Sequence, residues 1–338
     1  MNGRQRCLAA LGGEPVDRTP VFPLLMFLAA DRLGISYRRY ATDGRALAEA
    51  QLKVRERFEL DAITACSDAF RITADLGASM RFPEQATPYC AQPLVRSEAD
   101  LRRLRRPDPL AAGSRMADRI AAVAEMVRAA GSDTLVLGWV DLPFAEACSV
   151  CGLADFMVLL YDSPKLAHAL LEFLTEVVID FCRAQLETGA PMIGAGDAAA
   201  SLVSPKLYRE FALPYERRVV EAVHERDALL KLHICGNTTA LLPDMLDAGA
   251  DLYNVDHLVD FDLALQRYGR AGRCFKGNLD PAGDLVFASA SHAEREAVKR
   301  VRLASRAGAR YMLSAGCEVP ATVHDEVFEA FCRATRRA

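Results

Sequence analysis

The sequence lacks the features that would tie the chain to a membrane or to nucleic acid. No stretch approaches the roughly 18 consecutive apolar residues of a membrane-spanning helix. The first segment, MNGRQRCLAALGGEPVDRTP, has neither the long apolar core nor the small-residue cleavage site of a secretion signal. The formal net charge is only −4, and acidic residues flank the arginine cluster over 102–106. We therefore expect neither a membrane nor a nucleic acid as a partner.

The cysteines show no disulfide pattern. Ten of them are scattered through 338 residues with 51% hydrophobic content, which is typical of reduced and mostly buried thiols. This usage predicts a cytoplasmic protein. Cys148 and Cys151 form a C-x-x-C pair, but no second pair accompanies them, so we interpret both as core residues.

Short apolar runs alternate with helix-patterned segments along the chain. A strand–helix unit repeated eight times predicts an α/β fold of the (β/α)₈ TIM-barrel type. A doubly wound sheet fits less well, because no GxGxxG follows a predicted strand. The length suits one barrel domain over residues 1–338. The predicted strands are TPVFPLL from Thr19, DAITAC from Asp61, TLVLGWV from Thr134, PMIGAG from Pro191, LLKLHIC from Leu229, DLYNVD from Asp251, RCFKGN from Arg273 and RYMLSAG from Arg310.

The connections between these strands read as helices. The clearest spans 205–226, with Ser204 as N-cap and Pro205 at the first helical position. The interval from Arg71 to Asp133 exceeds a single crossover helix, so we expect an extra helical and loop segment over the barrel mouth. Further helices are predicted over 238–248, 294–307 and 323–333.

Polar side chains follow the predicted strands at the end where TIM barrels carry their active sites. His233 and Cys235 are two residues apart, so they point to the same side, and a loop carrying Cys317 can reach inward across the mouth. Two thiolates and one imidazole suit zinc and leave a fourth position open. The pattern by itself fits a buried core histidine and unrelated cysteines at least as well. The polar set is Asp68, Asp141, Asp197, His233, Cys235, Asp256, Asn278, Asp280 and Cys317.

Extended motifs make the chain similar to one known superfamily. In chain order they are GGEPVDRTP, LDAITACSDAF, GDAAASLVSPKLYREFALPYERRVV, LHICGNTTALLPDMLDAGAD, FKGNLDP and SAGCEVPATV. Together they resemble the uroporphyrinogen decarboxylase superfamily, whose fold is a (β/α)₈ barrel. That superfamily contains true decarboxylases and cobalamin-dependent methyltransferases.

The decarboxylase branch is matched only in part. True decarboxylases carry an arginine-rich RQAGRY segment shortly after the DRTP motif, where this chain has PLLMFLAADRLGISYRRY. They also carry a late GHG, where this chain has Gly316, Cys317 and Glu318. Asp68 does match the position of their central aspartate. Porphyrinogen decarboxylation therefore stays open as an alternative, as does a non-catalytic barrel that binds a tetrapyrrole or corrinoid.

The methyltransferase branch is matched at the candidate ligands. The chain resembles methylcobamide:thiol methyltransferases, whose zinc is held by an H-x-C pair and a late cysteine. The resemblance puts His233, Cys235 and Cys317 on zinc. It implies methyl transfer between a corrinoid such as methylcobalamin and a small-molecule acceptor or donor. The sequence has no D-x-H-x-x-G cobalamin-binding motif, so we expect the corrinoid on a separate small protein that docks over the mouth.

Five residues at the strand ends are candidates for supporting roles, each with a structural alternative. Asp68, Asp197 and Asp256 are the candidate catalytic carboxylates. Asp197 is either a displaceable fourth zinc ligand, a hydrogen-bond partner of His233, or an N-cap; Asp256 either orients a ligand or caps a helix. Asn278 and Asp280, in KGNLDP, match a superfamily motif and are candidates for cofactor binding, or they form a structural turn.

Overall fold

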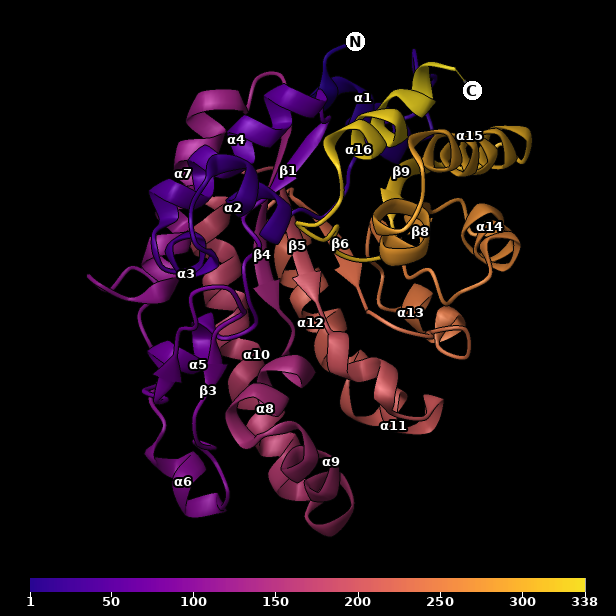
Figure 1. Cartoon of the computed structure of the whole chain (residues 1–338). Coiled ribbons are helices and arrows are strands. Elements are labelled where there is room, and N and C mark those ends of the chain that lie inside the picture. Colours follow the sequence, from indigo (N-terminus) through magenta and orange to yellow (C-terminus); the bar gives the residue numbers. More distant parts are fainter. Residues whose placement is uncertain (338) are drawn as a thin grey trace.

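Seven parallel strands curl into a barrel in the computed structural model, which describes residues 1–337 (Figure 1). Their order in the sheet follows the chain, so each strand pairs with the next one along the sequence. This is the arrangement predicted for a TIM barrel. The strands are β1 (Ala62–Thr64), β4 (Leu135–Asp141), β5 (Met192–Gly196), β6 (Leu229–His233), β7 (Leu252–Val255), β8 (Cys274–Leu279) and β9 (Tyr311–Ala315).

The eighth position of the barrel is filled by an irregular segment, so the prediction of a strand from Thr19 was wrong. Val21 forms a single parallel bridge with Leu313 of β9. Its carbonyl accepts a hydrogen bond of 3.0 Å from the Asp61 amide, just before β1. Pro20 and Pro23 have no N–H group, so they cannot extend this bridge into a ladder. The segment therefore closes the ring between β9 and β1 through a few contacts only.

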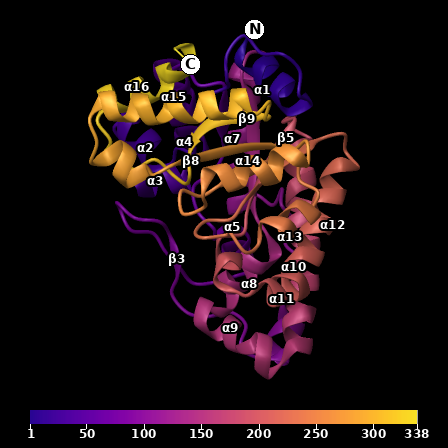
Figure 2. The same cartoon turned by 90° about the vertical axis from the view of Figure 1, so that its right-hand side faces the viewer.

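Helices cover the outside of the sheet, as Figures 1 and 2 show. The longest, α10, packs against α8, α12 and β4, and its buried residues form one apolar face. The helices are α1 (Gly3–Gly12), α2 (Phe27–Leu33), α3 (Tyr37–Thr42), α4 (Gly44–Phe58), α5 (Arg71–Asp75), α6 (Glu98–Arg103), α7 (Arg115–Ala130), α8 (Pro143–Cys151), α9 (Leu153–Asp162), α10 (Pro164–Leu186), α11 (Pro205–Phe211), α12 (Leu213–His224), α13 (Leu242–Asp247), α14 (Phe261–Arg270), α15 (Ala290–Arg306) and α16 (Asp325–Arg333), with short helices η1 (Ala198–Leu202), η2 (Pro281–Val286) and η3 (Ala334–Arg336).

Two predicted helices differ from the observed ones because of proline. The single helix expected over 205–226 is divided at Ala212 into α11 and α12. Pro214 lies in the first turn of α12, where its missing N–H does no harm, but it cannot continue a helix from α11. The helix expected over 238–248 begins only at Leu242, again with a proline, Pro243, in its first turn.

The extra segment after β1 lies beyond the C-terminal ends of the strands, as expected. It consists of α5, the two-stranded hairpin of β2 (Met80–Arg81) and β3 (Tyr89–Cys90), and α6. In Figure 1 this segment extends below the sheet on the same side as α8, α9 and α11. Within residues 1–337 no single helix is long and apolar enough to cross a membrane; α8 and α9 pass that test only jointly, as a pair bent by 107°.

The barrel interior is packed with side chains. The layer at the N-terminal ends of the strands is a buried apolar cluster that includes Phe22, Leu137 and Met192. Closer to the C-terminal ends, the Trp139 ring lies against two glycines of β5. A Cβ on Gly194 would come within 2.6 Å of the ring, and one on Gly196 within 2.9 Å. These glycines leave the space that the tryptophan fills. The open part of the barrel is therefore confined to the C-terminal ends of the strands.

Candidate metal centre

Three donor side chains converge at the mouth of the barrel. Nε2 of His233 lies 2.9 Å from Sγ of Cys235 and 3.7 Å from Sγ of Cys317, and the two sulfurs are 3.3 Å apart. One tetrahedral zinc ion would hold such atoms roughly 3.5–3.8 Å apart. The three donors therefore fit one zinc ion after small movements. Among residues 1–337 this is the only group of three or more His, Cys, Asp or Glu side chains with donor atoms all within 4.8 Å.

Two different strands bring these ligands together. His233 ends β6, and alternation along the strand turns Leu229, Lys231 and His233 toward the barrel interior. Cys235 follows two residues later, whereas Cys317 comes from the loop after β9. The imidazole is buried, but both cysteines are partly exposed. The open side of the group thus faces the mouth.

Strand β7 contributes no ligand, yet it holds both cysteine loops. The carboxylate of Asp256 accepts a hydrogen bond of 2.9 Å from the Gly236 amide, next to Cys235. The Asn254 side chain donates one of 2.9 Å to the Gly316 carbonyl, next to Cys317. A Cβ on Gly316 would lie 2.3 Å from the backbone nitrogen that follows Asp256, so only glycine allows this close approach.

The contact between the donors changes the acidity of both thiols. Hydrogen bonds from Cys235 and His233 lower the pKa of Cys317 well below its usual range. Donation to Cys317, together with burial, raises the pKa of Cys235 well above its usual range. One thiolate is therefore favoured even without a metal ion. Two sulfurs and one imidazole nitrogen form a donor set that suits zinc, and binding would release the remaining thiol proton.

Two buried lysines lie on the inner side of the ligands. Nζ of Lys231 is 4.5 Å from the Trp139 ring centroid. Nζ of Lys276 donates to the Phe22 carbonyl at 2.6 Å and to Oγ of Ser314 at 3.2 Å. Burial lowers the pKa of Lys231 to about 8. These amines and rings close the floor of the site, so a substrate can approach only from the mouth.

Asp68 belongs to a separate cluster of buried charges. Both of its carboxylate oxygens accept hydrogen bonds of 2.8 Å from the guanidinium of Arg115, and Ser67 donates a further one of 2.5 Å. Arg71 lies 3.5 Å away and also faces Asp141 at 3.7 Å. Although burial alone would raise it, these arginines hold the pKa of Asp68 well below its usual range. The carboxylate is thus saturated by partners from the chain itself.

Asp197 does not reach the three donors. Met192, Gly194 and Gly196 occupy the inward positions of β5, so Asp197 is turned the other way, toward Glu216 of α12. Burial and the neighbouring Glu216 raise the pKa of Asp197 well above its usual range, and burial raises that of Glu216 to about 7. The two buried carboxyl groups therefore favour a protonated state. Asp197 is also the N-cap residue of η1, but its side chain makes no capping hydrogen bond.

Asn278 and Asp280 tie loops together at the rim. The Asn278 side chain donates a hydrogen bond of 2.6 Å to the Val259 carbonyl, and its Oδ1 accepts one of 3.4 Å from Arg300. Asp280 caps η2, because its carboxylate accepts a hydrogen bond of 2.9 Å from the Ala282 amide. Neither side chain belongs to the donor group, and both contacts are those of structured turns.

Four residues of the site went unnoticed in the sequence. Lys231 and Asn254 stand at alternate positions to His233 and Asp256 in LLKLHIC and DLYNVD, a spacing that indicates the same inward face. Arg115 and Glu216 carry no such signal, because they meet their partners from helices distant in sequence.

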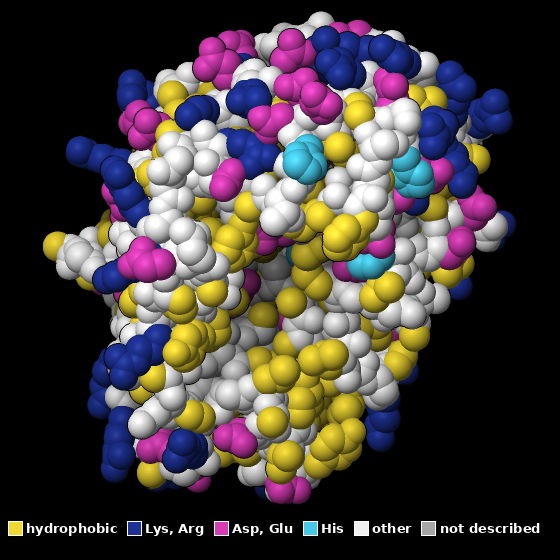
Figure 3. All heavy atoms as spheres, viewed as in Figure 1, with side chains coloured by type: hydrophobic (Ala, Val, Ile, Leu, Met, Phe, Trp, Pro, Cys, Tyr) yellow, Lys and Arg dark blue, Asp and Glu magenta, His cyan; other side chains and the backbone are white. Residues whose placement is uncertain are grey.

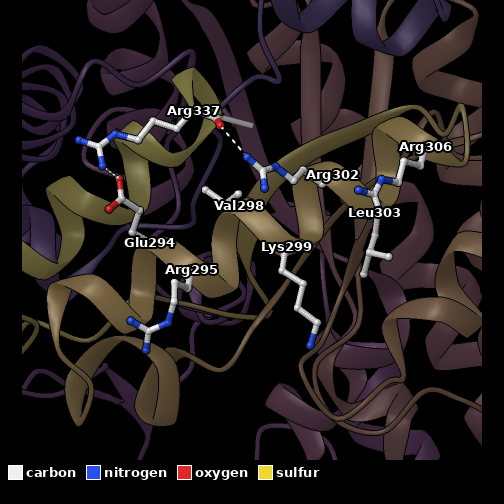
Figure 4. Close-up of a pocket in the computed structure, with 8 residues that line it drawn as sticks. All are labelled: Glu294, Arg295, Val298, Lys299, Arg302, Leu303, Arg306 and Arg337. Carbon is white, nitrogen blue, oxygen red and sulfur yellow. Dashed lines mark hydrogen bonds and ion pairs between the residues drawn. The ribbon is translucent and has the colours of Figure 1, made fainter.

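A groove on the outer face of α15 is chemically different from the mouth. Figure 4 shows its lining, in which Arg337 pairs with Glu294 at 2.8 Å. Basic side chains at 295, 299, 302 and 306 give this helix face a positive stripe that the sequence analysis did not anticipate. Its lining has no histidine, cysteine or aspartate, so it does not resemble the donor group at the mouth.

Comparison with known proteins places the chain in a family. The family model described as uroporphyrinogen decarboxylase (URO-D) matches residues 2–338. The chain belongs to the uroporphyrinogen decarboxylase family. It is 32% identical over 300 residues to a uroporphyrinogen decarboxylase of Xanthomonas axonopodis pv. citri, covering 82% of this chain and 81% of the relative. A uroporphyrinogen decarboxylase of Nocardia farcinica is 31% identical over 322 residues, covering 89% and 85%.

Solved structures confirm the predicted fold. A methyltransferase from Methanosarcina mazei superposes with a TM-score of 0.89 at 23% identity, covering 100% of this chain and 99% of that one. A B12-independent methionine synthase from Shewanella gives a TM-score of 0.57 at 10% identity, with 94% of each chain covered. At these identities the likeness concerns the barrel alone.

Proposed function

We propose that this family member is a zinc-dependent methyltransferase that moves a methyl group between a corrinoid and a small thiol or similar acceptor. One observation carries the proposal: the donor atoms of His233, Cys235 and Cys317 meet within 4.8 Å at the mouth of the barrel. Three protein ligands with an open fourth position are typical of catalytic zinc sites. The likeness to a methyltransferase supports the choice of reaction only through the shared fold.

The chemistry asks for a nucleophile that is ionised at neutral pH. A free thiol, with a pKa near 8.5, is mostly protonated there, and zinc would supply the positive charge that ionises a thiol bound at its open position. The chain's residues would then orient the substrate. The partly buried side chains of Cys235 and Cys317 face the mouth, and the floor of Lys231 and Trp139 blocks the opposite side.

Exposed apolar side chains around the mouth support a docked partner. Leu202 follows β5, Leu258 follows β7, and Phe287, which is 85% exposed, follows β8; Tyr161 of α9 is 72% exposed. Figure 3 shows apolar side chains bordering the hollow on this face. Such patches mark interaction surfaces. Since the sequence lacks a cobalamin-binding motif, we propose that these residues contact a small corrinoid-carrying protein.

Zinc content and methyl transfer test the proposal together. The purified protein should contain about one zinc per chain and should demethylate methylcobalamin in the presence of an acceptor from a panel of small thiols. Removal of zinc by a chelator should stop the reaction, and added zinc should restore it. Full activity of the metal-free protein would overturn the proposal.

Porphyrinogen decarboxylation is the second candidate, because the named relatives are uroporphyrinogen decarboxylases. It is less favoured since Asp68, the residue matching their central aspartate, is already occupied by Arg115 and Ser67. Conversion of uroporphyrinogen by metal-free protein would establish this reaction in place of the first.

A further inference from the structure

Several buried polar atoms near the ligands have no hydrogen-bond partner in the described part of the chain, and two of them lie on neighbouring strands. Nδ1 of His233 and Oδ1 of Asn254 both lack a hydrogen bond within residues 1–337. The two residues are only 3% and 1% exposed, so solvent does not compensate them. Unsatisfied buried polar atoms are rare in folded proteins, and those that occur call for an explanation.

The sheet register places these residues side by side. His233 of β6 is the register partner of Asn254 of β7, and the strands are parallel. Register partners in a parallel pair project to the same face, on strands roughly 4.8 Å apart. Both side chains therefore enter the barrel interior at the same level.

The amide of Asn254 is already oriented by its other hydrogen bond. Its Nδ2 donates 2.9 Å to the Gly316 carbonyl, so the amide nitrogen is directed at the Cys317 loop and the oxygen is left for a different donor. The neighbouring Lys276 is committed to the Phe22 carbonyl and to Ser314. Nζ of Lys231 also has no hydrogen-bond partner among the described residues, but it lies over the Trp139 ring on the β4 side.

The carboxylate of Asp197 is the other acceptor near His233 that lacks a partner. It follows β5 with its side chain turned out of the barrel, beside Glu216. The His233 ring enters the interior, on the opposite face of the sheet. Asn254 is therefore the acceptor on the correct side.

We propose that Asn254 positions both ends of the metal centre: its Oδ1 accepts the Nδ1–H of His233 while its Nδ2 holds the Gly316 carbonyl beside Cys317. The first bond fixes the tautomer that leaves the Nε2 lone pair for the metal, a role that a hydrogen-bond acceptor plays at most metal-binding histidines. It requires rotation of the imidazole about its Cβ–Cγ bond, which is a broad and soft torsion. The inference rests on the metal centre of the proposed function and does not depend on which methyl donor or acceptor is used.

Zinc affinity of three variants tests this role. We would measure the dissociation constant by competition with a chromophoric chelator for the wild type, Asn254→Leu, Asn254→Asp and the control Gln51→Leu. Asn254→Leu removes donor and acceptor and should weaken binding about 10–100-fold. Asn254→Asp keeps an acceptor for His233 but loses the N–H donor to the Gly316 carbonyl, so it should bind zinc less tightly than the wild type and more tightly than Asn254→Leu. Gln51 is a buried amide that serves Leu25 and Tyr40, so its loss should leave zinc affinity unchanged.

The outcomes separate this role from a purely structural one. If Asn254 only held the Gly316 carbonyl, Leu and Asp would weaken binding equally, since both lack the N–H donor, and the proposal would be overturned. A wild type that binds no zinc would overturn both this inference and the proposed function. Normal zinc binding with equal affinity in all variants would overturn this inference alone.

A crystal structure of the zinc-loaded wild type gives a second measurement that needs no variant. The distance from Nδ1 of His233 to Oδ1 of Asn254 should be that of a hydrogen bond, about 2.7–3.2 Å. A water molecule or any other acceptor on Nδ1 would contradict the proposed contact.

Discussion

The cluster around Asp68 and the group around His233 sit at the same mouth but differ in how their polar atoms are satisfied. Asp68 is enclosed by Arg115, Ser67 and Arg71, and its oxygens accept at least three hydrogen bonds from the chain. In the other group, two sulfurs and a nitrogen face one another with no cation within reach of hydrogen bonding among the described residues.

We interpret the first cluster as stabilising and, under the proposed function, the second as the reactive centre. Charges that are matched within the chain hold helices and loops in place and leave little capacity for a ligand. Donor atoms that lie together without a positively charged side chain as partner can still bind a metal cation from solution. Substitutions in the two clusters should therefore have opposite consequences for folding and for metal binding.

Loss of one ligand should give the largest effect. His233→Ala and Cys317→Ser each leave two protein donors, and we expect zinc binding to weaken by more than the roughly 10–100-fold caused by losing an outer hydrogen-bond partner. Elemental analysis after dialysis should then find zinc in the wild type and none in either variant. Asp68→Asn serves as the control and should retain zinc. Equal zinc content in all four proteins would show that the two clusters do not differ in their role in metal binding.

Asp68→Asn should instead reduce stability. Removing one charge from a buried ion pair costs about 3–5 kcal/mol, because Arg115 is left without its counter-charge and Arg71 keeps only Asp141. Urea unfolding of the wild type and the variant would measure this difference in the free energy of unfolding. A difference below about 0.5 kcal/mol, the range of ordinary surface substitutions, would show that the cluster is not structural.

The Asp68 effect should also depend on pH in a defined direction. The folded-state pKa is depressed below the unfolded value near 3.9, so the stabilisation is complete above about pH 5. It is lost as the pH falls toward the folded pKa. The stability gap between the wild type and Asp68→Asn should therefore narrow on acidification.

Glu216→Gln should show the opposite pH dependence. Burial raises the pKa of Glu216 to about 7, so its neutral form is favoured in the folded protein. Its favourable contribution is complete below the unfolded pKa near 4.3 and is lost as the pH rises toward 7. Unfolding measured between pH 4 and pH 8 should show the wild type losing more stability than Glu216→Gln. Parallel curves would contradict the raised pKa.

The smallest expected effect concerns the rim. Phe287→Asp should leave zinc content and stability nearly unchanged but slow methyl transfer with a protein-bound corrinoid about 10-fold, as for a central interface residue. Transfer with free methylcobalamin should not change. Lys299→Ser, on the outer groove of α15, is the matched control. If both corrinoid forms react equally slowly, the rim acts on catalysis and not on docking.

The sequence was sufficient for most of the barrel. Seven strands could be predicted from apolar runs, because burial on both faces of a parallel strand leaves that simple pattern. The eighth could not, since Pro20 and Pro23 interrupt hydrogen bonding in a segment that is otherwise apolar like a strand. Pro214 divided a predicted helix for the same reason.

The candidate site could be predicted only where the spacing of residues along a strand fixes the side to which they point. His233 and Cys235 follow from alternation, whereas Cys317 needed a family resemblance as well, because its approach depends on Gly316 packing against β7. The partners of Asp68 were not predictable, since Arg115 comes from a helix 47 residues away. Alternation also placed Asn254 inward, but an asparagine in an apolar strand gives no sign of what it binds.

The separation of Cys235 and Cys317 along the chain gives the metal a further mechanical meaning. The two cysteines are 82 residues apart in sequence, and this interval includes strands β7, β8 and β9. One ion held by both would act on the unfolded chain as a removable cross-link does, by restricting a long loop. A covalent link closing a loop of that length is worth about 4–5 kcal/mol in the chain-entropy model. Bound zinc would thus make unfolding of this last part of the barrel less favourable, and removal of zinc should lower the free energy of unfolding.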